Sequence, residues 1–104
     1  MSNEKRLAYL VNLVDGGSRD PMALYGLAMA YRVAGQNESA VATFTKLREA
    51  HPSYVAMYLM CAEAYEAMAN RDEAREWLVA GIAEAKRVGN GHAQGELETM
   101  LAAF

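Results

Sequence analysis

Hydrophobic residues recur along this chain at intervals of three and four, the spacing of amphipathic helices, and no stretch shows the sustained alternation of a strand. The first helix is expected over residues 3–14, and the glycines between Asp15 and Ser18 end it. Its apolar stripe consists of Leu7, Leu10, Val11 and Val14. The pattern along the whole chain predicts an all-α fold.

Capping and turn residues set the bounds of the next two helices. Asp20 is a favourable N-cap, and Pro21 suits the first helical position because its missing N–H would have no partner there. This second helix is expected to run up to Gly35, which closes it. The third helix begins near Asn37 and ends before Pro52, because a proline disfavours helical geometry at the preceding residue.

Three more helices are expected in the second half of the chain. Ser53 can cap a fourth helix over residues 54–68. Asp72 places an acidic group near the start of a fifth helix, which runs to about Val88. Glycines then break the chain before a sixth helix over residues 92–103.

The chain repeats itself at an interval of 34 residues, the distance from Tyr31 to Tyr65. A helix–turn–helix unit of this length resembles the tetratricopeptide repeat. In the first copy the resemblance rests on Leu27, Ala28, Tyr31, Gly35, Ala40, Phe44 and Pro52, and Leu24 stands where the family has a tryptophan. In the second copy it rests on Tyr58, Cys61, Ala62, Tyr65, Ala74 and Leu78, whereas Gly81 and Lys86 depart from the family pattern.

The resemblance implies antiparallel helix hairpins stacked as a short right-handed solenoid of about six helices in a single domain, residues 1–104. The expected parts are a flanking helix at 3–14, a first repeat at 21–52, a second repeat at 54–88 and a capping helix at 91–104. In the first hairpin, small side chains allow a close approach, and Tyr31 and Phe44 are expected to fill the space beside it. Trp77 is expected to pack between the fifth and sixth helices.

Composition and charge narrow the class of partner. The net charge is −3 and there is no basic cluster, which disfavours nucleic acid, whose phosphates require Lys and Arg. No run reaches the roughly 18 apolar residues of a membrane span, so no membrane partner is expected. The single cysteine, Cys61, excludes an internal disulfide and fits a reducing compartment, so we expect a cytoplasmic protein.

No catalytic constellation, metal site or cofactor is predicted. Cys61 falls at a packing position of the fourth helix, where a buried thiol is expected, and no spacing brings His51 or His92 near it. The histidines also lack nearby ligands at metal-binding spacing. The glycine-rich run 89–95 opens a helix and could cradle a phosphate, but it lacks the Lys-Ser/Thr of a P-loop, so a flexible turn is the preferred interpretation.

The resemblance points to a binding surface. In the tetratricopeptide family, the first helix of each hairpin lines a concave groove that binds extended or helical peptides. By position, Gly26 lies in this groove, together with the candidate binding residues Met22, Tyr25, Met29, Arg32, Val33, Leu59, Met60 and Glu63. An equal alternative is that the terminal helices cover this surface and make it part of the core.

The function predicted from these features is a non-enzymatic adaptor that binds an unidentified peptide or partner protein through the concave face. The alternative is a structural module whose apolar methionine and tyrosine face forms a homodimer, because pairing two chains would extend a short groove. An enzyme is the third class, and no residue pattern in the sequence supports it.

Overall fold

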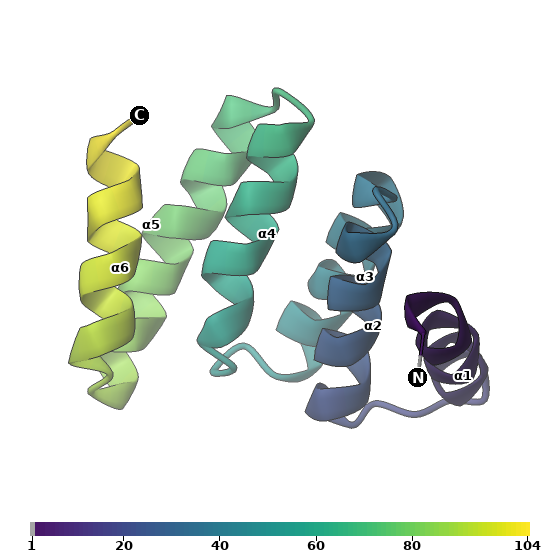
Figure 1. The fold of residues 1–104 in the computed structure, drawn as a ribbon. Coiled ribbons are helices and arrows are strands. Elements are labelled where there is room, and N and C mark those ends of the chain that lie inside the picture. Colours follow the sequence, from purple (N-terminus) through teal and green to yellow (C-terminus); the bar gives the residue numbers. More distant parts are fainter. Residues whose placement is uncertain (1) are drawn as a thin grey trace. The chain divides into compact units, whose positions relative to one another are not determined.

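The computed structural model describes residues 2–104, whose regular structure consists of six α-helices (Figure 1). They are α1 (Asn3–Asp15), α2 (Pro21–Val33), α3 (Asn37–Ala50), α4 (Ala56–Ala67), α5 (Arg71–Val88) and α6 (Gly91–Ala102). These bounds confirm the all-α fold and the six predicted helices. None of the helices in residues 2–104 is long and apolar enough to cross a membrane.

The chain divides into two compact units, and each contains one hairpin and one flanking helix. Unit 1 ends at His51 and contains α1 and the α2–α3 hairpin. Unit 2 begins at Pro52 and contains the α4–α5 hairpin and α6 (Figure 1). The 34-residue repeat in the sequence therefore corresponds to one hairpin in each unit.

In unit 1, small and aromatic side chains form the inside of the hairpin. Ala28 and Ala40 are fully buried, and so is Phe44, whose ring makes a T-shaped contact with the Tyr25 ring at a centroid distance of 6.2 Å. Tyr31 was expected in this core, but it is only partly buried. Phe44 is therefore the most deeply buried aromatic side chain of unit 1.

In unit 2, Trp77 of α5 packs against aromatic rings of α4. Its ring centroid lies 5.7 Å from that of Tyr58 and 6.5 Å from that of Tyr65. The prediction that Trp77 packs between the fifth and sixth helices was wrong, because both of these ring partners belong to α4. Trp77 is 3% exposed, so it stabilises the hairpin itself.

The flanking helix α6 is held on α5 by an apolar side chain and an aromatic ring. Leu97 is 1% exposed, and the Arg71 guanidinium lies 4.4 Å from the centre of the Phe104 ring. A cation over an aromatic face is attracted by the negative charge density of the ring. These contacts pack α6 against α5, and the capping role of this helix stays a prediction.

Gly81 allows the three helices of unit 2 to meet closely. A Cβ atom placed on this residue would lie 2.5 Å from the Tyr58 Cβ of α4 and 3.1 Å from Leu97 Cδ1 of α6. The first distance is shorter than any carbon–carbon contact that a packed interior tolerates. Only glycine fits at this point of α5 without moving a neighbouring helix.

Most of the predicted helix ends are confirmed. The Asp20 carboxylate accepts a hydrogen bond from the Met22 N–H at 2.8 Å, as an N-cap should, and Gly89 closes α5 with a positive φ of 75°. The predicted cap at Ser53 was wrong. The fourth helix, α4, begins only at Ala56, and no side chain caps it.

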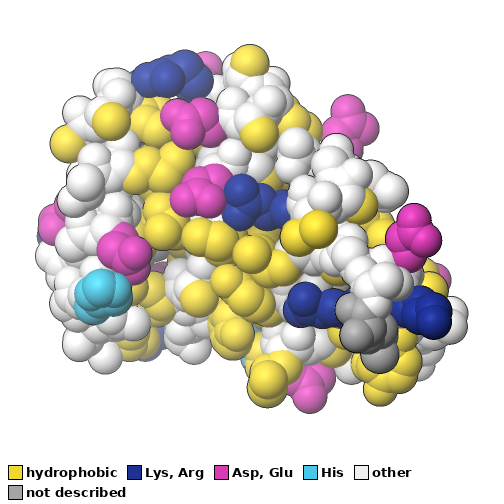
Figure 2. All heavy atoms as spheres, viewed as in Figure 1, with side chains coloured by type: hydrophobic (Ala, Val, Ile, Leu, Met, Phe, Trp, Pro, Cys, Tyr) yellow, Lys and Arg dark blue, Asp and Glu magenta, His cyan; other side chains and the backbone are white. Residues whose placement is uncertain are grey.

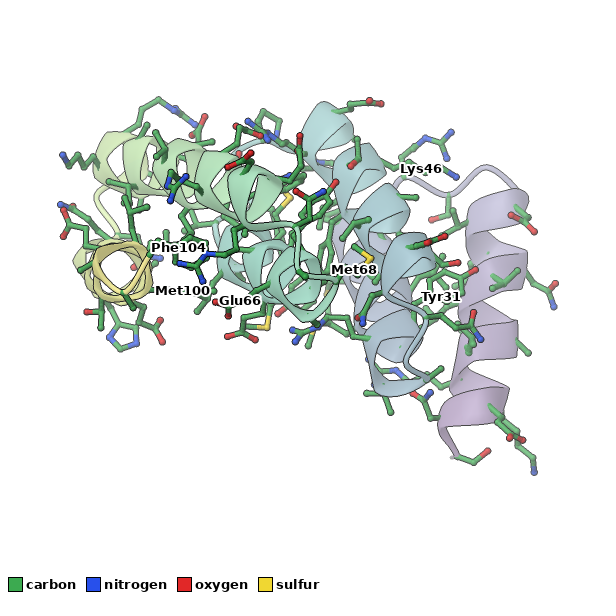
Figure 3. All side chains as sticks on the ribbon, turned by 90° about the horizontal axis from the view of Figure 1, so that it is seen from above. Tyr31, Lys46, Glu66, Met68, Met100 and Phe104 are labelled. Carbon is green, nitrogen blue, oxygen red and sulfur yellow. The ribbon has the colours of Figure 1, made fainter. Side chains whose placement is uncertain are left out.

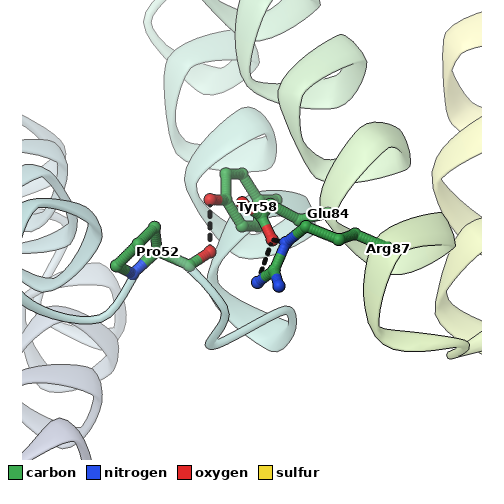
Figure 4. Close-up of polar contacts among 4 residues, drawn as sticks. All are labelled: Pro52, Tyr58, Glu84 and Arg87. Carbon is green, nitrogen blue, oxygen red and sulfur yellow. Dashed lines mark hydrogen bonds and ion pairs between the residues drawn. The ribbon is translucent and has the colours of Figure 1, made fainter.

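Replacing Tyr58 with phenylalanine is expected to lower the free energy of unfolding by about 0.5–1.5 kcal/mol, the net value of one hydrogen bond. The Tyr58 hydroxyl donates to the Pro52 carbonyl at 2.5 Å, which ties α4 to the segment that precedes it (Figure 4). Urea unfolding followed by circular dichroism measures the change. The control is Tyr9→Phe, because Tyr9 is 59% exposed and its change should have no effect. Equal losses in the two variants would contradict a stabilising role for the Tyr58 hydroxyl.

Candidate functional site

An open cavity of about 720 Å³ lies between α4 and α6 of unit 2. This volume is in the range of sites that bind small molecules or side chains of a partner. Two residues of α4 and six of α6 line the cavity: Leu59, Glu63, Gly91, His92, Gly95, Glu96, Thr99 and Met100. Figure 2 shows hydrophobic side chains gathered over these two helices with acidic side chains beside them, and in Figure 3 Met100 lies on the side of α6 that faces α4.

Two glycines leave the α6 wall of this cavity without side chains. A Cβ atom added at Gly91 or Gly95 would meet no atom within 4 Å, so neither glycine is required by close packing. Gly95 lies inside α6, where glycine costs roughly 1 kcal/mol relative to alanine. Gly95 thus makes α6 less stable than alanine would, and it stands where a larger side chain would narrow the cavity.

Gly95→Ala is expected to raise the free energy of unfolding by about 0.5–1 kcal/mol. The helix gains from alanine, and the new methyl group enters open space within the cavity. Chemical unfolding of the variant and the wild type measures this difference. A less stable variant would contradict the finding that the space beside Gly95 is open, because it would mean that the added methyl group meets a neighbouring atom.

The charges at the cavity are acidic. Glu63 of α4 is partly buried. The Oε1 atom of Glu96 in α6 lies 3.4 Å from Nε2 of His92, and this contact is an ion pair only when His92 is protonated. The Thr99 hydroxyl donates to the Gly95 carbonyl at 2.8 Å, so it serves the helix rather than the cavity. The site combines an apolar floor with carboxylates at its edge.

Of the predicted binding residues in the second repeat, the structure places Leu59 and Glu63 together in this cavity. Met60 is partly buried on the same helix, but it does not line the cavity. The residues that α6 contributes were not among the predicted binding residues, because the sequence favours a flexible turn at 89–95 and a capping helix after it. The glycine inside this helix was the one signal in the sequence that pointed to them.

The predicted binding residues of the first repeat lie on α2 in unit 1. Met22 and Val33 are 76% and 70% exposed, so both side chains are accessible to a partner. Tyr25, Met29 and Arg32 are partly buried. Because the Tyr25 ring also packs on the core ring of Phe44, it contributes to stability as well as to the surface.

Gly26 was placed on the same binding face, and this prediction was wrong. Gly26 is buried, and a Cβ atom there would lie 3.5 Å from Leu10 Cδ1 and 3.6 Å from Arg6 Nη2, both on α1. The Asn3 amide also donates to the Ala30 carbonyl at 3.1 Å. Helix α1 therefore covers the side of α2 that carries Gly26, as the core alternative proposed, while Met22 and Val33 remain accessible.

Among the titratable side chains, the Tyr65 phenol of α4 has a shifted pKa. Burial raises the pKa of the Tyr65 phenol above its ordinary value, and the electrostatic effects of Cys61, Glu73 and Glu76 raise it further. The phenol consequently stays protonated at neutral pH and cannot act as a base. Within residues 2–104, no group of three His, Cys, Asp or Glu side chains could hold a metal ion.

Comparison with known proteins places this geometry in a family. A sequence model described as tetratricopeptide repeat matches residues 33–95. The solved tetratricopeptide repeat domain protein of Salinibacter ruber is 28% identical, with a TM-score of 0.75 over 81% of this chain and 93% of that chain. No match was found among curated proteins.

A second solved structure shares the fold at lower sequence similarity. The type III secretion translocator chaperone SycD of Yersinia enterocolitica is 14% identical, with a TM-score of 0.76 over 98% of this chain and 89% of that chain. At this identity the likeness concerns the fold alone.

Proposed function

Because the chain belongs to the tetratricopeptide repeat family, we propose that it is a non-enzymatic adaptor that binds a peptide or a partner protein. The observation that carries this proposal is the open cavity between α4 and α6. An apolar floor, acidic groups at the edge and a wall opened by Gly95 suit a side chain inserted by a partner. Protein-interaction modules of this kind act through surface shape and need no catalytic group.

The proposed binding residues fall into one set in each unit. In unit 2 they are Leu59 and Glu63 of the cavity, with Met60 beside them on α4. In unit 1 they are the exposed side chains of Met22 and Val33 and the partly buried side chains of Tyr25, Met29 and Arg32. Methionine adapts its shape to different partners, which suits a surface that binds peptides.

The test begins with a library of random dodecapeptides displayed on phage and selected against the full chain. The affinity of the selected peptides is then measured for the wild type and for Gly95→Leu, whose side chain would occupy the cavity. We expect Gly95→Leu to weaken binding by about tenfold or more while the chain stays folded. The matched control is Ala102→Leu, which adds the same bulk at an exposed position of α6 outside the cavity.

Two outcomes would contradict the proposal. If no peptide is selected by the folded chain, the adaptor function fails. If peptides are selected but Gly95→Leu binds them as tightly as Ala102→Leu does, the cavity is not their binding site.

Self-association remains the second candidate function, and the exposed apolar side chains of unit 1 favour it. Tyr9, Met22 and Val33 are 59%, 76% and 70% exposed. Light scattering of the purified chain tests it, with the double variant Met22→Ser/Val33→Ser as the comparison. A wild-type mass that corresponds to two chains, and a single-chain mass for the variant, would support a homodimer. A single chain at roughly tens of micromolar would exclude a dimer in the affinity range of specific interfaces.

A further inference from the structure

We infer that the outward face of α5 pairs with the same face of a second copy of this chain, with the two α5 helices antiparallel. This surface lies in unit 2 and contains none of the proposed binding residues, so the pairing is independent of the adaptor function. It also differs from a dimer formed through the exposed side chains of unit 1. Three features of α5 support the pairing: the spacing of exposed residues, a hollow among them, and the charges at the two ends.

A row of exposed residues runs along α5 on the side opposite its buried residues. We call this row the α5 seam, and it consists of Asp72, Glu76, Val79, Ala83 and Lys86. The intervals between them alternate between four and three residues, an average of about 3.5, which is the interval at which helices pair in a coiled coil. In Figure 3 the side of α5 that points away from α4 and α6 meets no other helix of unit 2. At 18 residues, or about 27 Å, α5 is long enough for such a pairing.

An open hollow of about 450 Å³ lies along the seam. All the residues that line it belong to α5: Asp72, Arg75, Glu76, Val79, Ala80 and Ala83. Four of them, Glu76, Val79, Ala80 and Ala83, stand at positions i, i+3, i+4 and i+7, and four such residues form the hole that receives one side chain of a paired helix. Val79 is 54% exposed and has a suitable size for this hole. One helix therefore supplies both the projecting side chain and the hollow that receives it.

The charges along the seam change sign from one end of α5 to the other. Asp72 lies in the first turn of the helix and Lys86 in its last turn, and each is seven residues away from Val79. An antiparallel pair centred on the two Val79 side chains therefore places each Asp72 opposite the Lys86 of the second copy. A parallel pair would place Asp72 opposite Asp72 and Lys86 opposite Lys86, which repel each other.

The contact that Asp72 already makes leaves room for this pairing. Its carboxylate lies 3.6 Å from Nη1 of Arg75, and its side chain is 99% exposed. An ionised carboxylate accepts several hydrogen bonds, so it can hold Arg75 and a lysine of the second copy at once. The helix dipole also favours an acidic residue at the start of α5 and a basic one at its end. It does not account for the exposed Val79 and Ala83 between them at coiled-coil spacing.

A second copy suits this face better than an unrelated helix. A two-fold pair uses the same patch on both chains, so the patch must be complementary to itself. The α5 seam meets this requirement in shape and in charge. None of its residues lines the cavity between α4 and α6. The dimer would therefore carry two such cavities, and it would hold a partner with two binding segments more tightly than one chain does.

Sedimentation equilibrium of the full chain at roughly 1 to 500 µM tests the pairing. One helix from each chain makes a small interface, so we expect a dissociation constant of about 10–50 µM. Val79→Glu should weaken the association by about tenfold or more, because it places two carboxylates at the centre of the pair. The matched control is Val88→Glu, the same change on the same helix at a 44% exposed position outside the seam, which should associate as the wild type does.

An exchange of charges tests the antiparallel arrangement. Asp72→Lys and Lys86→Glu should each weaken the association by about threefold to tenfold. Asp72→Lys also makes the net charge of −3 less negative, so a general charge effect would strengthen the association instead. The double variant Asp72→Lys/Lys86→Glu keeps the wild-type net charge and places opposite charges together again. It should associate nearly as well as the wild type.

Four outcomes would overturn the pairing, once circular dichroism has shown that each variant is folded. The first is a single-chain mass over the whole concentration range, and the second is an equal loss in Val79→Glu and Val88→Glu. The third is a double charge variant as weak as the two single variants. The fourth is a dimer that Met22→Ser/Val33→Ser abolishes and Val79→Glu does not, because it would then form through unit 1. The adaptor function stands or falls separately, by peptide selection.

Discussion

Replacing Phe44 with alanine is expected to lower the free energy of unfolding by about 3–5 kcal/mol, the cost of removing a large aromatic side chain from a packed core. Phe44 is fully buried in unit 1, and its ring makes a T-shaped contact with the Tyr25 ring, with 6.2 Å between the ring centroids. The truncation would leave a void on the inside of the α2–α3 hairpin. Denaturant unfolding monitored by circular dichroism measures the loss.

Tyr31→Ala is the matched control for this prediction. Tyr31 lies in the same hairpin and matches a family position as Phe44 does, but its side chain is partly exposed. Its removal should therefore cost clearly less than that of Phe44. If Tyr31→Ala is the more damaging of the two, the assignment of Phe44 as the centre of unit 1's core is wrong.

Replacing Gly81 with alanine is expected to lower the free energy of unfolding by about 1–3 kcal/mol, although alanine favours the helix more than glycine does. The added methyl group would lie 2.5 Å from the Tyr58 Cβ. That atom is fixed to the backbone of α4, so relief requires α4 and α5 to move apart. Leu97 Cδ1, at 3.1 Å, belongs to a side-chain end and can yield more easily.

Gly95→Ala is the counterpart of this substitution in the same unit. The two variants make the same chemical change inside neighbouring helices and should shift stability in opposite directions, because Gly81 is enclosed whereas Gly95 faces open space. Thermal unfolding of the pair separates the two environments directly. A Gly81→Ala variant as stable as the wild type would contradict the close contact between α4 and α5.

The two copies of the repeat explain why Gly81 departs from the family pattern. At the 34-residue interval, Tyr58 corresponds to Leu24 and Gly81 corresponds to Leu47. All four residues are buried. The first hairpin places two leucines, Leu24 and Leu47, at these positions. The second hairpin has the larger Tyr58 on its first helix and the smaller Gly81 on its second, so the glycine makes room for the tyrosine.

The sequence predicted the helices better than the contacts between them. Turn and cap signals such as Asp20 and Gly89 act within a few residues, so the pattern alone placed five of the helix starts closely. The Ser53 cap failed because a turn delays the start of α4 to Ala56. The neighbours of Trp77 depend on how helices pack, and local spacing cannot supply that.

The candidate site was only half predictable for the same reason. Leu59 and Glu63 followed from the repeat, because the resemblance assigns a role to each position of the first helix. The residues of α6 lie outside the repeat and become part of the site only when α6 folds beside α4. Gly26 was misplaced because nothing in its own helix shows that α1 covers it.

The most direct test of the central claim, that a partner segment binds between α4 and α6, is a nuclear magnetic resonance titration of the isotopically labelled chain with a selected peptide. The largest shifts are expected at the backbone amides of Leu59, Glu63, Gly91, Gly95 and Met100, which line the cavity from both helices. They should disappear in Gly95→Leu. Shifts that leave these five amides unchanged and fall elsewhere, such as on the exposed face of α5 around Val79, would contradict the claim.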